Sequence, residues 1–160
     1  MALQLNEQAP DFTVMRADGE NVDEFRLSEH LGRTNLVLAF FPLAFTGVCT
    51  DEMCTFRDQL AQFNDLNAQV HGISVDSPFS LNVFIQQQAL TFPLLSDFNR
   101  EVSRAFGVLH EELMGLREIA KRSVFVLDPE GVVRYRWVSD DPGQMPDFDA
   151  VRAALSELQP

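Results

Sequence analysis

The sequence predicts an α/β fold with a mixed central sheet, flanking helices and a late antiparallel hairpin. Strands and helices alternate along the chain, and two apolar strands near the end are joined by a tight turn. The chain has 160 residues, of which 46% are hydrophobic and 14 are Phe. This length and composition suit one domain with a buried core, so we expect residues 1–160 to form a single domain.

The first half of the chain predicts parallel strands separated by helices. The apolar run over 35–41 indicates a strand that is buried on both faces. A long helix is expected over 49–67, because its apolar residues recur on one stripe: Phe56, Leu60, Phe63 and Leu66. Asp51 and Glu52 are expected in its first turn. The other elements expected in this half are strands at 11–15 and 70–75 and helices over 27–31 and 76–89.

The second half ends in the predicted hairpin. Asp128, Pro129 and Gly131 stand at the positions that these residues prefer in a type I turn. The elements expected here are strands at 92–95, 123–127 and 132–138 and helices over 99–106 and 147–158; the segment 111–121 shows no clear pattern. This order is typical of a thioredoxin-like three-layer fold. A flavodoxin-like sheet is the alternative, but it does not predict the hairpin.

Charge and composition exclude several classes of protein. There are 24 acidic and 12 basic residues, so the formal net charge is −12. This excess of acid argues against binding to nucleic acid or to an anionic membrane. No apolar run reaches the ~18 residues of a membrane helix, and the first residues lack the pattern of a signal peptide. We therefore expect a cytoplasmic protein with no membrane partner.

The cysteines and histidines predict no metal site and no cofactor. Cys49 and Cys54 are separated by four residues, which is too long for a thioredoxin C-x-x-C motif. Neither has a histidine nearby, so they make a poor zinc site. The three histidines are scattered along the chain, and we expect each of them on the surface or half-buried: His30, His71 and His110.

Cys49 stands where a buried strand has ended and the long helix begins. Functional sites in open α/β sheets collect at the carboxyl ends of strands. The amino end of a helix also stabilises a thiolate, which is the nucleophilic form of cysteine. Placement alone leaves two interpretations open, a reactive thiol and a buried structural cysteine.

The residues around Cys49 resemble the signature of the peroxiredoxins, a family of thiol peroxidases. The resemblance rests on the motif Pro42-x-x-x-Thr46-x-x-Cys49 and on Glu52 three residues later. Three further segments also resemble the family, in matching order: 6–13, 92–97 and 122–131. Within the family, the sequence is similar to the alkyl-hydroperoxide-reductase-E and bacterioferritin-comigratory-protein branches.

The resemblance implies that Cys49 attacks a hydroperoxide and becomes a sulfenic acid. Arg122 offers a permanent charge and fixed donors to the sulfur and the peroxide, and Thr46 offers a hydroxyl to a peroxide oxygen. Pro42 shields and shapes the pocket, and Glu52 is the candidate that orients the arginine. For Thr46 the alternative is a helix N-cap.

Cys54 is the candidate resolving cysteine, because some members of the second branch carry one five residues after the first. An intact helix separates such residues by ~7.5 Å and turns them apart by about 140°, so a disulfide requires the helix to unwind. The alternative for Cys54 is a packed small apolar side chain.

The family resemblance implies several partners. They are a hydroperoxide substrate, a thioredoxin-like, glutaredoxin-like or low-molecular-weight thiol reductant, and a second copy in a homodimer. The dimer contacts are expected near Phe45 and at the start of the helix over 99–106. The alternative function is a redox sensor or binding protein on the same fold. A thiol–disulfide oxidoreductase is disfavoured, because it would carry C-x-x-C and a proline in place of Arg122.

Overall fold

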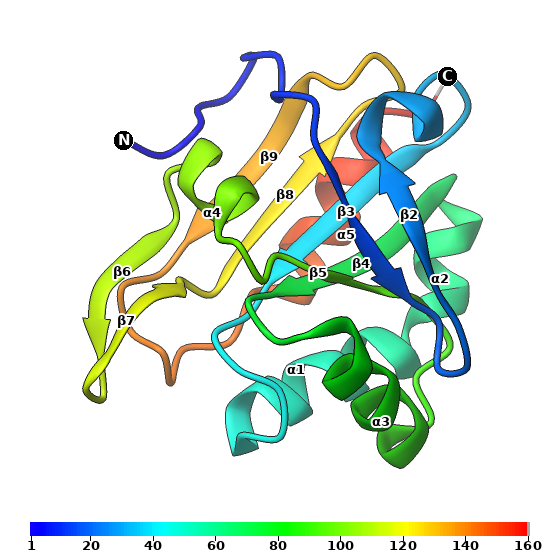
Figure 1. The fold of residues 1–160 in the computed structure, drawn as a ribbon. Helices are drawn as coiled ribbons and strands as arrows, with labels where there is room; N and C mark the ends of the chain where they lie inside the picture. Colours follow the sequence, from blue (N-terminus) through cyan, green and yellow to red (C-terminus); the bar gives the residue numbers. More distant parts are fainter. Residues whose placement is uncertain (160) are drawn as a thin grey trace.

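A seven-stranded mixed sheet runs through the centre of the computed structural model, which describes residues 1–159 (Figure 1). Its strand order is β2-β1-β5-β4-β3-β8-β9. The strands are β1 (Thr13–Ala17), β2 (Val22–Arg26), β3 (Asn35–Phe40), β4 (Ala68–Ser74), β5 (Leu94–Ser96), β8 (Ser123–Leu127) and β9 (Val133–Val138). β3, β4 and β5 are parallel, and the remaining neighbours pair antiparallel. The predicted fold class and the late hairpin, β8–β9, are confirmed.

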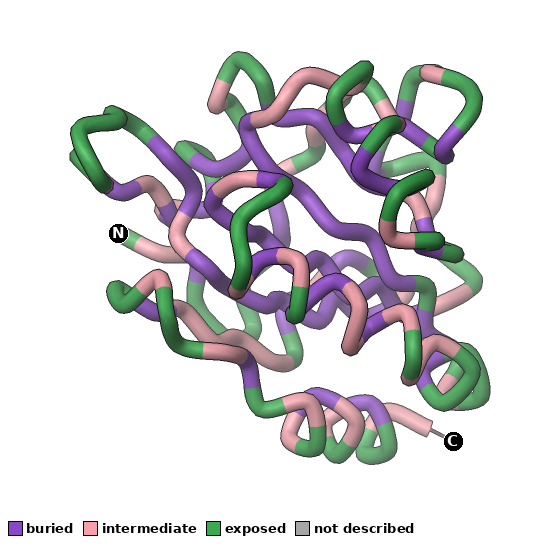
Figure 2. Tube along the Cα trace, turned by 90° about the horizontal axis from the view of Figure 1, so that it is seen from below, coloured by how far each residue is buried: buried purple, intermediate pink, exposed green. Residues whose placement is uncertain are grey.

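Helices and loops cover both faces of the sheet. One face packs against α1 (Gly47–Asp58), α2 (Leu60–Asp65), α3 (Pro78–Gln88) and α5 (Phe148–Glu157). The other is covered by the amino-terminal segment, by η1 (Leu27–His30) and by α4 (Glu101–Ala105). The side chains of the central strand β3 alternate between the two faces of the sheet. Val37 and Ala39 face the first layer, and Leu38 and Phe40 face the second. Buried residues accordingly run through the middle of the molecule, and exposed residues form the outer turns (Figure 2).

Several elements depart from the sequence prediction. β2 was not expected, because it is an edge strand whose charged residues mask the apolar pattern and in which only Phe25 is fully buried. β1 lies antiparallel to β5, so the expectation of parallel strands throughout the first half is wrong. The segment without a clear pattern forms a separate hairpin, β6 (Leu109–Leu113) and β7 (Leu116–Ala120). Its turn has positive φ at Met114 and Gly115, as hairpin turns require.

The long helix expected over 49–67 is two helices, α1 and α2, separated at Gln59. Because α1 begins at Gly47, Asp51 and Glu52 lie in its second turn, and the expectation of a first-turn position is wrong. The predicted apolar stripe nevertheless faces the core across the break. Phe56 and Phe63 are fully buried, and Leu60 and Leu66 pack against the same cluster.

Two of the three histidines are buried, contrary to expectation. His71 lies on the central strand β4, where both faces of the sheet are covered, and His110 lies on β6. The His71 ring is 5.0 Å from the ring of Phe25, centroid to centroid. Burial, and then the positive charges near it, lower the pKa of His71 to about 3. His71 is therefore neutral at physiological pH. His30 is half-buried, as expected.

Candidate active site

Cys49 lies in the first turn of α1, immediately beyond the carboxyl end of β3. The chain leaves β3 at Phe40, passes through a short loop and starts the helix after Thr46, which occupies the N-cap position. Cys49 is the third helical residue and is only 1% exposed. The first backbone N–H groups of a helix have no partner within it, and they give this end a partial positive charge. The Cys49 sulfur therefore lies at the positively charged end of α1.

Arg122 reaches the same point from β8, the strand next to β3 in the sheet. It directly precedes β8, which pairs antiparallel with β3 in a register that puts Ser123 opposite Phe40. The residue before β8 therefore lies beside the loop after β3. The guanidinium is 1% exposed, and its Nη2 donates to Cys49 Sγ at 3.3 Å. The same nitrogen donates to the carbonyl oxygen of Pro142 at 2.8 Å.

Glu52 holds the other end of the guanidinium. It lies on α1, three residues after Cys49, and Arg122 Nη1 donates to its Oε1 at 2.7 Å. The Glu52 side chain is fully buried, and burial raises its pKa to about 7, although the charge of Arg122 opposes this shift. Burial lowers the pKa of Arg122, but Glu52 and Cys49 raise it by more. The guanidinium is therefore always charged, and Glu52 is positioned to orient it.

A cavity of about 250 Å³ opens next to the Cys49 sulfur. Its walls are Pro42, Leu43, Thr46, Gly47, Val48, Cys49, Leu113, Met114, Arg122, Pro142 and Gly143. Pro42 is buried, whereas Thr46 is exposed. The structure thus brings five of the six predicted site residues into one place, with Glu52 directly behind Arg122.

The Thr46 hydroxyl does not cap the helix within the described residues. It donates instead to the carbonyl oxygen of Leu43 at 2.7 Å. Because its proton is engaged there, its oxygen is left to accept a hydrogen bond from a ligand in the cavity. Thr46 therefore occupies the N-cap position through its backbone only, while its side chain bonds to the loop and lines the cavity.

The loop that carries Thr46 is held by residues that the sequence did not single out. Phe45 has a φ of 69°, a conformation that is costly for a residue with a side chain. The preceding residue, Ala44, donates its N–H to Asp76 Oδ2 at 2.8 Å, and Ser74 Oγ donates to the same oxygen at 2.6 Å. Neither Asp76 nor the Pro142 carbonyl carries a local sequence signal, because each acts through a contact with a distant segment.

Cys54 is not brought to Cys49. Both cysteines lie on the intact helix α1 with free thiols. Cys54 is half-buried, and its Sγ donates to Gln88 Oε1 of α3 at 3.6 Å. Residues five apart on a helix point about 140° away from each other, so this conformation does not permit a disulfide between them.

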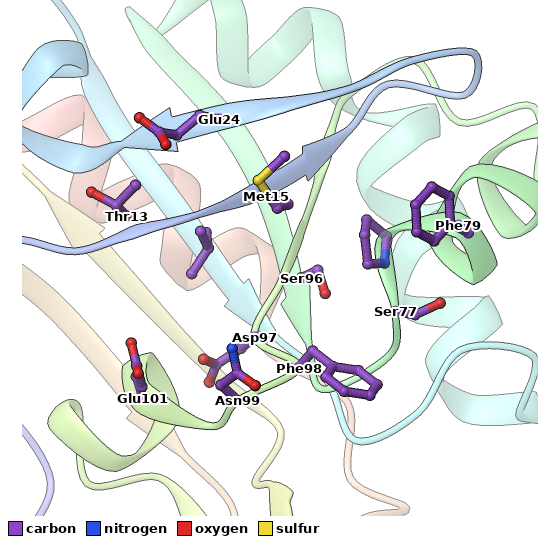
Figure 3. Close-up of a pocket in the computed structure, with 12 residues that line it drawn as sticks. Thr13, Met15, Glu24, Ser77, Phe79, Ser96, Asp97, Phe98, Asn99 and Glu101 are labelled. Atoms are coloured by element: carbon purple, nitrogen blue, oxygen red, sulfur yellow. The ribbon is translucent and has the colours of Figure 1, made fainter.

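A larger hollow of about 460 Å³ contains none of the predicted site residues (Figure 3). It lies between β1, the start of α3 and the loop after β5, and it is bordered by Met15, Phe79 and Phe98. Within residues 1–159, no group of three or more acidic, cysteine or histidine side chains is arranged to hold a metal ion. No helix in the same range is long and apolar enough to cross a membrane.

Comparison with protein families matches residues 5–136 to the AhpC/TSA family. The alkyl hydroperoxide reductase E of Mycobacterium tuberculosis is 37% identical over 158 residues, which cover 98% of each chain. The chloroplastic 2-Cys peroxiredoxin BAS1 of Spinacia oleracea is 34% identical over 143 residues, which cover 85% of this chain and 52% of the spinach protein.

Solved structures agree with the sequence comparisons. The peroxidoxin BcpB from Mycobacterium tuberculosis has a TM-score of 0.85 and 30% identity, with 99% of each chain covered. The AhpC of Mycobacterium tuberculosis has a TM-score of 0.86 and 28% identity, with 99% of this chain and 94% of that one covered. The similarity therefore extends over the whole described sheet and its helices.

Proposed function

Because this chain belongs to the AhpC/TSA family and is a thiol-dependent peroxidase of the peroxiredoxin type, we propose that Cys49 is its peroxidatic residue. The Cys49 thiolate attacks one oxygen of a hydroperoxide, an S–O bond forms and the O–O bond breaks. The sulfur becomes a sulfenic acid, and the leaving alkoxide or hydroxide takes up a proton. The observation that carries this proposal is the buried guanidinium of Arg122, 3.3 Å from the Cys49 sulfur.

Arg122 and Thr46 prepare the sulfur and the substrate for this reaction. The charge of Arg122 favours the thiolate and stabilises the negative charge that develops on the peroxide oxygens as their bond breaks. Thr46 accepts a hydrogen bond from the peroxide O–H and thereby aligns the O–O bond with the sulfur. The fixed donors of the buried Arg122 guanidinium lose little energy to reorganisation during the reaction.

Pro42 and Glu52 act without touching the reacting atoms. Pro42 is buried and walls the cavity on the side of β3. Glu52 fixes one arm of the guanidinium through a 2.7 Å hydrogen bond, which leaves the other arm directed at the sulfur. Glu52 is therefore a positioning residue in this proposal.

Cys54 resolves the sulfenic acid after α1 unwinds. The Cys54 thiolate attacks the oxidised sulfur, an S–S bond forms, and the S–O oxygen leaves as water. A thioredoxin-like or glutaredoxin-like protein, or a small thiol, then reduces the disulfide. The four residues between the cysteines support this step, because they allow the sulfurs to meet once the helical turn between them is lost.

We further propose that the chain forms a homodimer through the aromatic side chains around α3. Phe45, Phe79 and Phe98 are each at least half exposed, which is unusual for side chains of this size. Phe45 packs against Phe84 of α3, and Phe79 and Phe98 border the larger hollow (Figure 3). We also propose that the protein works in a reducing compartment, the cytoplasm, because the proposed cycle needs both thiols reduced before each turnover.

Single-turnover oxidation tests the proposal. Trp137, partly buried on β9, reports the reaction by stopped-flow fluorescence. Wild type and Cys54→Ser should react with hydrogen peroxide at the same fast rate, whereas Cys49→Ser should not react. Oxidation of the wild type no faster than a free thiol would refute peroxidase catalysis by Cys49 and favour a redox sensor on this fold.

A further inference from the structure

The contacts of Cys54 form a small polar cluster between α1 and α3, away from the Cys49 cavity. The Cys54 thiol donates to the side-chain Oε1 of Gln88 at 3.6 Å. Arg57, one helical turn after Cys54, donates through Nη1 to the backbone carbonyl oxygen of Gln88 at 2.5 Å. Two residues of α1 are therefore attached to a single residue of α3. We name Cys54, Arg57 and Gln88 the helix clasp.

Gln88 is suited to this attachment by its place in the chain. It is the last residue of α3, and the next residue, Ala89, adopts a left-handed conformation that ends the helix. The last carbonyl groups of a helix have no partner within it, and the guanidinium of Arg57 supplies one here. Because Arg57 fixes the Gln88 backbone against α1, the Gln88 side chain is held beside Cys54.

The clasp must open before Cys54 can reach Cys49. The two thiols point about 140° apart on an intact helix, so the turns between them must unwind. Cys54 then leaves the Gln88 side chain, whereas Arg57 lies beyond the segment that has to unwind. The hydrogen bond from the Cys54 thiol to Gln88 thus opposes the motion on which the resolving step depends.

We propose that Gln88 is a positioning residue that sets the rate at which Cys54 closes on oxidised Cys49. This inference rests on the proposed resolving role of Cys54. In the closing step the Cys54 sulfur bonds to the sulfenic sulfur, the S–O bond breaks, and the oxygen leaves with the Cys54 proton as water. A slower closure prolongs the life of the sulfenic acid, which a second peroxide converts to sulfinic acid.

The experiment follows one round of oxidation by rapid quenching, thiol alkylation and intact mass. A gain of one oxygen identifies the sulfenic acid, and a loss of two hydrogens identifies the disulfide. Gln88→Ala removes the acceptor of the Cys54 thiol, and we expect closure to be roughly three to ten times faster, the size of effect that one weak hydrogen bond gives. Gln87→Ala, an exposed neighbour on the same helix, should close at the wild-type rate.

The Gln88→Glu variant distinguishes an effect of the Cys54–Gln88 hydrogen bond on the rate of disulfide formation from an effect of a general loss of stability. The carboxylate keeps an acceptor beside Cys54 and adds a negative charge that opposes formation of the attacking thiolate, so closure should be several-fold slower. A variant that only loosened the fold would instead form the Cys49–Cys54 disulfide faster than the wild type. With excess peroxide, the sulfinic fraction should fall in Gln88→Ala and rise in Gln88→Glu, while the first oxidation of Cys49 keeps its wild-type rate in both.

Two failures can be told apart. If the wild type forms the disulfide and both Gln88 variants close at its rate, the clasp proposal is wrong and the resolving role of Cys54 stands. If the wild type stops at the sulfenic acid although Cys49 reacts rapidly, the resolving role of Cys54 is wrong and the clasp proposal falls with it.

Discussion

Replacing Glu52 by glutamine removes an ionisable group from a buried ion pair while keeping its shape. Glu52 is fully buried, and one of its oxygens accepts from Arg122 at 2.7 Å. Its second oxygen, Oε2, has no hydrogen-bond partner among residues 1–159. Burial outweighs the ion pair, so the pKa of Glu52 is raised from 4.5 to about 7.

This shift makes stability depend on pH in a defined direction. Well below pH 4.5 the carboxyl group is protonated in both the folded and the unfolded chain. Between 4.5 and about 7 the unfolded chain releases the proton first, so the free energy of unfolding falls as the pH rises. A shift of the Glu52 pKa from 4.5 to about 7 corresponds to a loss of about 3 kcal/mol by pH 8.

The assay is urea unfolding followed by Trp137 fluorescence at several pH values between 4.5 and 8.5. The difference in unfolding free energy, wild type minus Glu52→Gln, should decrease by about 3 kcal/mol over this range. Asp51→Asn, an exposed carboxyl group on the same helix, controls for the loss of one negative charge. A difference that stays constant with pH would refute the reasoning, because it would mean that Glu52 is ionised throughout this range.

Three further substitutions test the site and the core. Arg122→Lys should slow the first oxidation of Cys49 by roughly 10²-fold in stopped flow, since an ammonium group cannot bond the sulfur, Glu52 and the Pro142 carbonyl together. Thr46→Val should slow the same step by roughly 10-fold or more, because it lacks the hydroxyl. His71→Leu should reduce acid sensitivity: the pKa of His71 is about 3 when folded, so the wild type loses stability as the pH falls from 6.5 towards 3.

Each of these three predictions has an outcome that would contradict it, and Thr46→Val also has a matched control variant. Thr46→Ser keeps the hydroxyl and should stay near the wild-type rate, and equal rates for serine and valine would show that the hydroxyl has no part in the reaction. An oxidation rate unaltered in Arg122→Lys would reduce the role of Arg122 to that of a simple charge. For His71→Leu, the comparison is the unfolding free energy at pH 7 and pH 4, and an unchanged difference between these pH values would contradict the buried neutral histidine.

The order of elements was largely predictable because the central strands are long apolar runs. β3 and β8 were predicted to within one residue, since every residue of both is buried. The edge strand β2 and the hairpin β6–β7 escaped prediction because their exposed residues break the alternation. His71 and His110 were misjudged for a related reason, since burial depends on what covers a strand rather than on the residue itself.

The motif residues of the site were predictable because their arrangement is local. Pro42, Thr46 and Cys49 lie within one strand end, one loop and one helical turn. Their spacing therefore determines their positions relative to one another, and the family resemblance on which they rest is confirmed by the AhpC/TSA match.

The amino-acid order alone determined that a thiol would stand at the amino end of a helix behind a buried strand. The family resemblance implied that Arg122 is the charge beside this thiol, and only the tertiary structure explains how the two residues meet. Arg122 is 73 residues from Cys49 in the chain, and the antiparallel register of β3 with β8 brings the two together. The contact of Arg122 with the Pro142 carbonyl and the attachment of Cys54 to Gln88 likewise depend on packing between distant segments. Helix periodicity relates residues that are close in the chain, whereas strand pairing and side-chain burial join residues at any separation, so the sequence alone does not determine these contacts.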